Sequence, residues 1–98
     1  MAILKDPERK EVHQLHKLVQ LSGKRVLEIG CGDGRFTWRY AGTADRITGI
    51  DPDGEALKTA LSTCPVLLRG KIALAQANAV TLPHPHDIFD LAILSWSL

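Results

Sequence analysis

The chain has 98 residues, which is enough for one small domain with a single core. Apolar residues make up 45% and charged residues 23%, as in soluble globular proteins, and a formal net charge of +1 gives no basic field for nucleic acid. No apolar run approaches the roughly 18 residues of a membrane span, and the start of the chain does not resemble a signal peptide. We therefore expect a cytoplasmic protein that binds neither membrane nor nucleic acid.

The two cysteines, Cys31 and Cys64, are too few for a disulfide framework and have no metal-ligand spacing, so a reduced setting is expected. Charge is uneven, because residues 1–25 hold six Lys and Arg against three Asp and Glu, whereas the remainder holds six against eight. The basic segment fits either an acidic partner or, more simply, a solvated helix face.

Residues 6–21 are predicted to form a helix. Asp6 can serve as its N-cap, and Pro7 suits the first helical position. Apolar residues then recur at three- and four-residue spacing, which gives one apolar stripe, and Gly23 is well placed to end the helix.

After Gly23 the apolar period changes to short runs bounded by glycine and proline, which is typical of buried strands. The predicted strands are 25–30, 46–51, 72–77 and 88–96. Helices are predicted between the first three strands, one ending at Gly42 and one from Glu55 to about Thr63, where Pro65 follows. Strands alternating with helices predict an α/β fold with a parallel sheet. One domain is expected, with an N-terminal helix in 1–23 and the core in 24–98.

Three glycines, Gly30, Gly32 and Gly34, follow the first predicted strand and open a helix. Ligands of doubly wound sheets bind at the carboxyl ends of strands, where glycines let the backbone approach closely. A dinucleotide-binding loop has the spacing GxGxxG, whereas this loop is GxGxG and follows an acidic residue, Glu28. That carboxylate would repel a pyrophosphate and favour an ammonium group.

The segment VLEIGCGDG resembles motif I of the class I S-adenosylmethionine-dependent methyltransferases, close to the small-molecule enzymes grouped as type 11. ITGIDPD resembles the acidic end of that family's second strand, AQANAVTLP its adenine-contacting segment, and FDLAILSWSL its fourth strand. The resemblance covers roughly residues 24–98 and implies a Rossmann-like fold, S-adenosylmethionine as cofactor and methyl transfer as activity. The family's sheet has the order 3-2-1-4-5-7-6, so the four strands here would have the order 3-2-1-4.

The resemblance also implies roles for individual residues. Backbone N–H groups of the glycine loop would bind the cofactor's carboxylate, and Glu28 would favour its amino group or order the loop. Asp51 would accept both ribose hydroxyls. Pro52 would pack on the adenine, and Asn78 would form hydrogen bonds with the adenine edge. The family more often has Asp at the position of Asn78. The full cofactor-binding set expected is Glu28, Gly30, Cys31, Gly32, Gly34, Asp51, Pro52, Asn78, Ala79 and Ser95.

Three of these residues also have a purely structural interpretation. Glu28 could anchor the loop, Asp51 could cap the next helix (although Asp53 is the better cap), and Asn78 could be a turn residue. Cys31 is expected to be a small residue whose backbone is used, not a nucleophile, and Cys64 to be packed.

The four histidines indicate little about function. His13 and His16 on the first helix lack further metal ligands, so no metal is expected. His84 and His86, in a proline-punctuated loop, could act as bases but fit a loop surface better. Trp96 could line a substrate pocket or cover the sheet, and no catalytic base is assigned.

Only the first four strands of the family's sheet are found, so the substrate-binding half is absent and the methyl acceptor, expected to be a small molecule, is undefined. The fourth strand would then form an apolar edge, which predicts self-association or a fragment of a longer chain. Two other functions stay open: a non-catalytic cofactor-binding or interaction module and, less favoured, a fragment of an NAD-dependent oxidoreductase.

Overall fold

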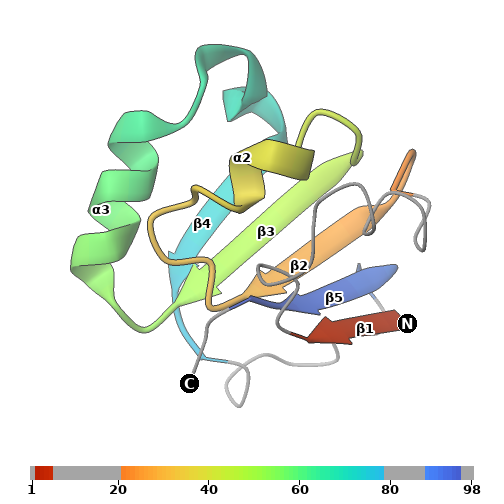
Figure 1. Ribbon diagram of the computed structural model, residues 1–98, viewed down its shortest axis with the longest axis horizontal. Helices are drawn as coiled ribbons and strands as arrows, with labels where there is room; N and C mark the ends of the chain where they lie inside the picture. The colour runs from red at the N-terminus through yellow and green to blue at the C-terminus, as the bar shows by residue number, and fades with distance from the viewer. Residues whose placement is uncertain (1, 6–20, 79–87, 96–98) are drawn as a thin grey trace.

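The computed structural model describes residues 2–5, 21–78 and 88–95. They form one five-stranded sheet in which every neighbouring pair of strands is parallel. The strands are β1 (Ala2–Lys5), β2 (Arg25–Ile29), β3 (Arg46–Asp51), β4 (Ile72–Gln76) and β5 (Leu91–Leu94). Their spatial order is β1-β5-β2-β3-β4, which confirms the predicted order of the four core strands (Figure 1).

The helical elements are α2 (Thr37–Tyr40), α3 (Gly54–Thr63) and the 3₁₀ helix η2 (Val66–Lys71). Figure 1 shows α2 and α3 on the same face of the sheet. The side chain of Asp53 caps α3 by accepting from the N–H groups of Glu55 and Ala56. Among the described residues no helix is long and apolar enough to cross a membrane.

The core lies between the central strands and α2. In β2 and β5 consecutive residues are buried, as expected for parallel strands covered on both faces. Phe36 and Tyr40, at the two ends of α2, pack on each other with ring centroids 5.3 Å apart, and both belong to the same buried cluster as residues of β2, β3 and β5. The cluster contains Leu21, Val26, Phe36, Tyr40, Ala41, Ala44, Ile47, Leu91 and Ile93.

The N-terminus corrects two predictions. Residues 1–23 are not helical throughout, because β1 occupies Ala2–Lys5 and pairs in parallel with β5. The expectation that the strand formed by Leu91–Leu94 is an open edge is therefore wrong in this structure. The predicted helix over 6–21 lies outside the described residues apart from Leu21, after which Gly23 turns the chain with φ +75°.

Other boundaries differ slightly. β5 begins at Leu91 instead of residue 88, because Ile88 is in a helical turn and 51% exposed, and Asp90 is held to the start of β2. α2 is only four residues long, and Leu61 on α3 is 61% exposed. The inward face of α3 is carried by Leu57 and Ala60.

Asp90 and Arg25 fasten β5 to β2 at the end where both strands begin. The Asp90 carboxylate accepts from the backbone N–H of Arg25 at 2.9 Å and from its guanidinium at 3.1 Å, while the N–H of Asp90 donates to the Arg25 carbonyl at 2.8 Å. The guanidinium hydrogen bonds lower the pKa of Asp90 to about 2.

The pairing of Asp90 with Arg25 predicts that the stability of the fold depends on pH. Because the pKa of Asp90 is lower in the folded chain than its ordinary value of 3.8, the stability that Asp90 contributes is present above pH 4 and is lost as pH falls toward 2. Thermal unfolding followed by circular dichroism should show that Asp90→Asn lowers the melting temperature at neutral pH and that the difference from wild type shrinks toward pH 2. A difference independent of pH would contradict the assignment.

Candidate functional site

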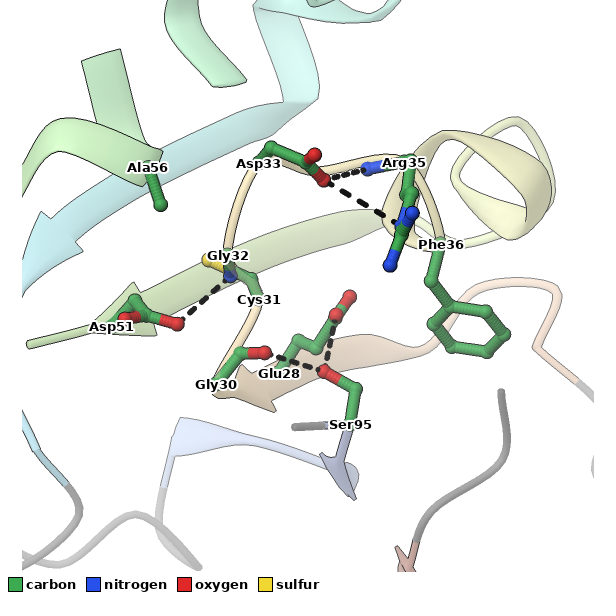
Figure 2. A pocket seen from close by; sticks show the side chains of 10 residues that line it. All are labelled: Glu28, Gly30, Cys31, Gly32, Asp33, Arg35, Phe36, Asp51, Ala56 and Ser95. Carbon is green, nitrogen blue, oxygen red and sulfur yellow. Dashed lines mark hydrogen bonds and ion pairs between the residues drawn. The ribbon is translucent and has the colours of Figure 1, made fainter. Parts of the chain in front are cut away.

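A pocket of about 270 Å³ opens at the carboxyl ends of β2, β3 and β5. β2 lies between β3 and β5, so the chain connections depart to opposite sides here, which is where doubly wound sheets bind ligands. Figure 2 shows side chains from the glycine loop, both neighbouring strand ends and α3 converging on it. The lining residues are Glu28, Gly30, Cys31, Gly32, Asp33, Arg35, Phe36, Asp51, Ala56 and Ser95.

The loop between β2 and α2 requires glycine at three positions. Gly30, Gly32 and Gly34 have φ values of +80°, +56° and +85°, a region that other residues avoid. At Gly34 packing adds a second requirement, because a Cβ would lie 2.3 Å from the ring of Trp38. The loop can therefore pass close over the strand ends while α2 begins directly behind it.

The loop's N–H groups form internal hydrogen bonds. The N–H groups of Gly30 and Cys31 donate to the Ile50 carbonyl at 2.8 and 3.1 Å, and the N–H of Gly32 donates to Asp51 Oδ2 at 2.9 Å. That these N–H groups bind a ligand carboxylate stays a prediction, and such a ligand would have to share or displace these partners. Their role in this structure is to fasten the loop to β3.

Asp51 is the centre of that attachment. Its side chain is buried, with Oδ2 accepting from Gly32 and Oδ1 accepting from the N–H of Asp53 at 2.8 Å (Figure 2 shows the first bond). One carboxylate thus fixes both the glycine loop and the turn into α3. Asp53, not Asp51, caps α3, as the sequence favoured.

Glu28 is fully buried on β2 and is held by three hydroxyl groups. Its Oε1 accepts from Thr37 Oγ1 at 2.7 Å and from Tyr40 Oη at 2.6 Å, both on α2, and its Oε2 accepts from Ser95 Oγ at 2.6 Å. Ser95 Oγ also lies 3.0 Å from the Gly30 carbonyl (Figure 2). Glu28 therefore fixes α2 and the residue after β5 to β2, and it also lines the pocket.

Electrostatics at the pocket disfavour added negative charge. Burial and the nearby carboxylates of Glu28 and Asp51 raise the pKa of the Cys31 thiol to about 12. Burial and Glu28 likewise raise the pKa of Tyr40 well above its ordinary value. Among the described residues, three carboxylates line the pocket against one guanidinium, that of Arg35, whose Nε lies 4.0 Å from Asp33 Oδ1.

Six predicted site residues line this pocket: Glu28, Gly30, Cys31, Gly32, Asp51 and Ser95. Gly34 does not line it and instead makes room for Trp38. Pro52 and Asn78 are exposed nearby: the Pro52 carbonyl accepts from Gln76 at 3.0 Å, and Asn78 follows Ala77, whose N–H donates to the Asp51 carbonyl. Ala79, all four histidines and Trp96 lie outside the described residues.

Four lining residues were not predicted. Asp33, Arg35 and Phe36 lie in or directly after the glycine loop, so their proximity could have indicated them. Ala56, in the first turn of α3, gives no chemical signal in the sequence and is found only from the fold.

The fold and the pocket define a doubly wound α/β domain with a cofactor-type site at its strand-order reversal. Residues 26–98 match the protein family described as "Methyltransferase domain". The chain therefore belongs to the class I S-adenosylmethionine-dependent methyltransferases.

Similar proteins agree with this assignment. Phosphoethanolamine N-methyltransferase 1 of Haemonchus contortus, solved with phosphoethanolamine and S-adenosylhomocysteine, is 28% identical with a TM-score of 0.73, over 86% of this chain and 18% of that one. An S-adenosylmethionine dependent methyltransferase of Mesorhizobium loti is 29% identical with a TM-score of 0.65, over 82% of this chain and 37% of that one. The tRNA U34 carboxymethyltransferase of Stutzerimonas stutzeri is 47% identical over 36 residues, which is 36% of this chain and 11% of that relative.

Alanine substitutions at the glycines should separate backbone conformation from packing. Gly32→Ala meets no atom within 4 Å but keeps a positive φ, so unfolding free energy should fall by about 1–2 kcal/mol. Gly34→Ala should cost more, because its Cβ would also collide with Trp38. Gly42→Ala, in open space without a positive φ, is the control, and urea unfolding measures all three. Equal losses at Gly32 and Gly34 would contradict the packing requirement.

Cys31 should be unreactive in the folded chain, because a thiol with a pKa of about 12 is almost never ionised near pH 8. In a Cys64→Ser variant, a thiol-specific disulfide reagent should react only after unfolding in denaturant. Rapid modification under native conditions would show that the thiol is neither buried nor perturbed as described.

Proposed function

We propose that the pocket binds S-adenosylmethionine and that this chain supplies the cofactor-binding half of a methyltransferase. The observation that carries the proposal is the pocket's charge: in the part of the chain that the structure describes, Glu28, Asp33 and Asp51 line it with one guanidinium, at the reversal point of a doubly wound sheet. A ligand with a sulfonium and an ammonium group matches that excess of negative charge. A pyrophosphate would meet repulsion there, which argues against a nicotinamide dinucleotide.

Asp51 is suited to hold the ribose hydroxyls. Both of its oxygens are oriented by backbone N–H groups, and each carboxylate oxygen can accept more than one hydrogen bond. The exposed rim formed by Pro52 and Asn78, next to the same strand end, would take the adenine. Glu28, fixed by its hydroxyl neighbours, would contribute negative charge behind the ligand's amino group.

When bound, the cofactor supplies an electrophilic methyl group for in-line transfer to a nucleophile. The contribution of this chain is positioning and electrostatics, since a loop fixed by Asp51 and Glu28 holds its shape before the ligand arrives. No residue is assigned as a catalytic base.

For the acceptor we propose a small molecule. A formal net charge of +1 does not favour tRNA, whose phosphates bind strongly basic proteins. The 36-residue match to the tRNA-modifying relatives covers about a tenth of their length, so their acceptor does not transfer to this chain.

Thermal unfolding with and without S-adenosylhomocysteine tests the cofactor site. Ligand at about 100 times its dissociation constant adds roughly 2.7 kcal/mol, which raises the melting temperature of so small a domain by about 10 °C or more. Asp51→Asn should remove most of this shift, measured against its own unliganded melt, because the amide loses the charge and one acceptor.

Two controls sharpen the result. Asp90→Asn removes a carboxylate at the opposite end of the sheet and should keep the full shift, and NADH should give none. A cooperative melt that S-adenosylhomocysteine leaves unchanged would refute cofactor binding by this chain, whereas a shift with NADH alone would favour the dinucleotide alternative.

A further inference from the structure

Exposed apolar side chains gather on one margin of the molecule, away from the cofactor pocket. Leu61 on α3 is 61% exposed, and Val66 and Leu67 on η2 are 74% and 93% exposed. Beside them a cleft of about 250 Å³ separates α3 and η2 from β4. It is lined by Leu61, Cys64, Arg69, Ile72 and Leu74. Large apolar side chains exposed beside an apolar cleft are typical of a protein–protein interface.

The same margin ends in β4, the last strand of the sheet on this side among the described residues. Its sequence, IALAQ, carries no charge, and Ala73, Ala75 and Gln76 are exposed. Edge strands that avoid pairing usually carry charged side chains, proline or a bulge. β4 has no charge or proline to prevent a further strand from adding to it.

Charges of opposite sign lie at the two ends of β4. Arg69, which is exposed, comes just before the strand. Asp53 and Glu55, also exposed, begin α3 next to the far end of the strand, where Gly54 packs on Gln76 so closely that a Cβ would lie 3.0 Å from Gln76 Oε1. Any antiparallel neighbour with the same layout would place its basic end beside this acidic end.

We propose that this margin, formed by β4, η2 and the outer side of α3, binds a second copy of the chain. The two β4 strands pair antiparallel about a two-fold axis near Leu74, so Leu74 of one copy meets Leu74 of the other, and the end of each margin that carries η2 lies beside the end of the other where α3 begins. Arg69 of each copy then lies near Asp53 and Glu55 of the other.

Self-complementarity favours a second copy over an unrelated partner. A two-fold interface needs one patch that presents both halves of every contact. This margin presents a strand that has no outer neighbour among the described residues, apolar side chains and both signs of charge. Glu55 pairs with Lys58 of its own helix at 3.4 Å through well-exposed side chains, so it can turn to a guanidinium in the neighbour. The Nε–H of Arg69 donates a hydrogen bond to the Cys64 carbonyl, and a guanidinium has four further N–H donors.

Sedimentation velocity of the full chain, from micromolar to submillimolar concentration, tests the proposal. Wild type should pass from one to two chains and stop there, because a two-fold contact closes. Arg69→Glu and Glu55→Arg should each raise the dissociation constant by about tenfold, since each turns two symmetric attractions into repulsions. The double variant Arg69→Glu/Glu55→Arg should restore the wild-type value.

Circular dichroism melts of all variants separate loss of pairing from loss of folding, and Lys5→Glu on β1 at the other edge of the sheet should leave pairing unchanged. A monomer at every concentration, open-ended association, or a double variant no better than the singles would overturn the proposal. So would sensitivity to Lys5→Glu, which would place the contact at β1. The test is independent of cofactor binding, because neither Arg69 nor Glu55 lines the cofactor pocket.

Discussion

The buried carboxylate of Glu28 is the constraint around which this small structure is arranged. It lies on the central strand β2 and accepts hydrogen bonds from α2 and from the residue that follows β5. An unsatisfied buried carboxylate would cost several kcal/mol, so Thr37, Tyr40 and Ser95 must stay where they are if the chain is to fold. The positions of α2 and of the end of β5 are therefore both set from β2.

Asp51 performs the corresponding task on the neighbouring strand, joining the glycine loop to the turn that begins α3. The carboxylates of Glu28 and Asp51 both stabilise the fold and line the pocket. Each fixes backbone or hydroxyl donors at a strand end, and together with Asp33 they give the pocket its negative character. A site built in this way keeps its shape without ligand, which lowers the cost of ordering on binding.

Much of this could be predicted from the sequence, because glycine spacing, apolar runs and strand–helix alternation are local signals. They predicted the strands, the parallel α/β class and the glycine loop, whereas the sheet order and six of the lining residues were implied by the resemblance to the methyltransferase family. β1 was missed because four residues carry almost no periodic signal, and its strand character comes from pairing with β5. The three hydroxyl groups that donate to Glu28, and the exposure of Leu61, also depend on contacts between different segments of the chain. Residue spacing along the sequence does not encode such contacts.

The pairing of β1 with β5 has a consequence for how the molecule is made. Ala2 lies opposite Leu91, and Lys5 lies opposite Leu94. The strand formed by the first few residues therefore cannot pair until a strand almost ninety positions later in the sequence has been synthesised. Contacts this distant in sequence form slowly, because the loop between them must close first. On the ribosome β2, β3 and β4 can associate early, whereas the sheet is completed only after residue 94 has emerged, and until then the β2 edge is open to other chains.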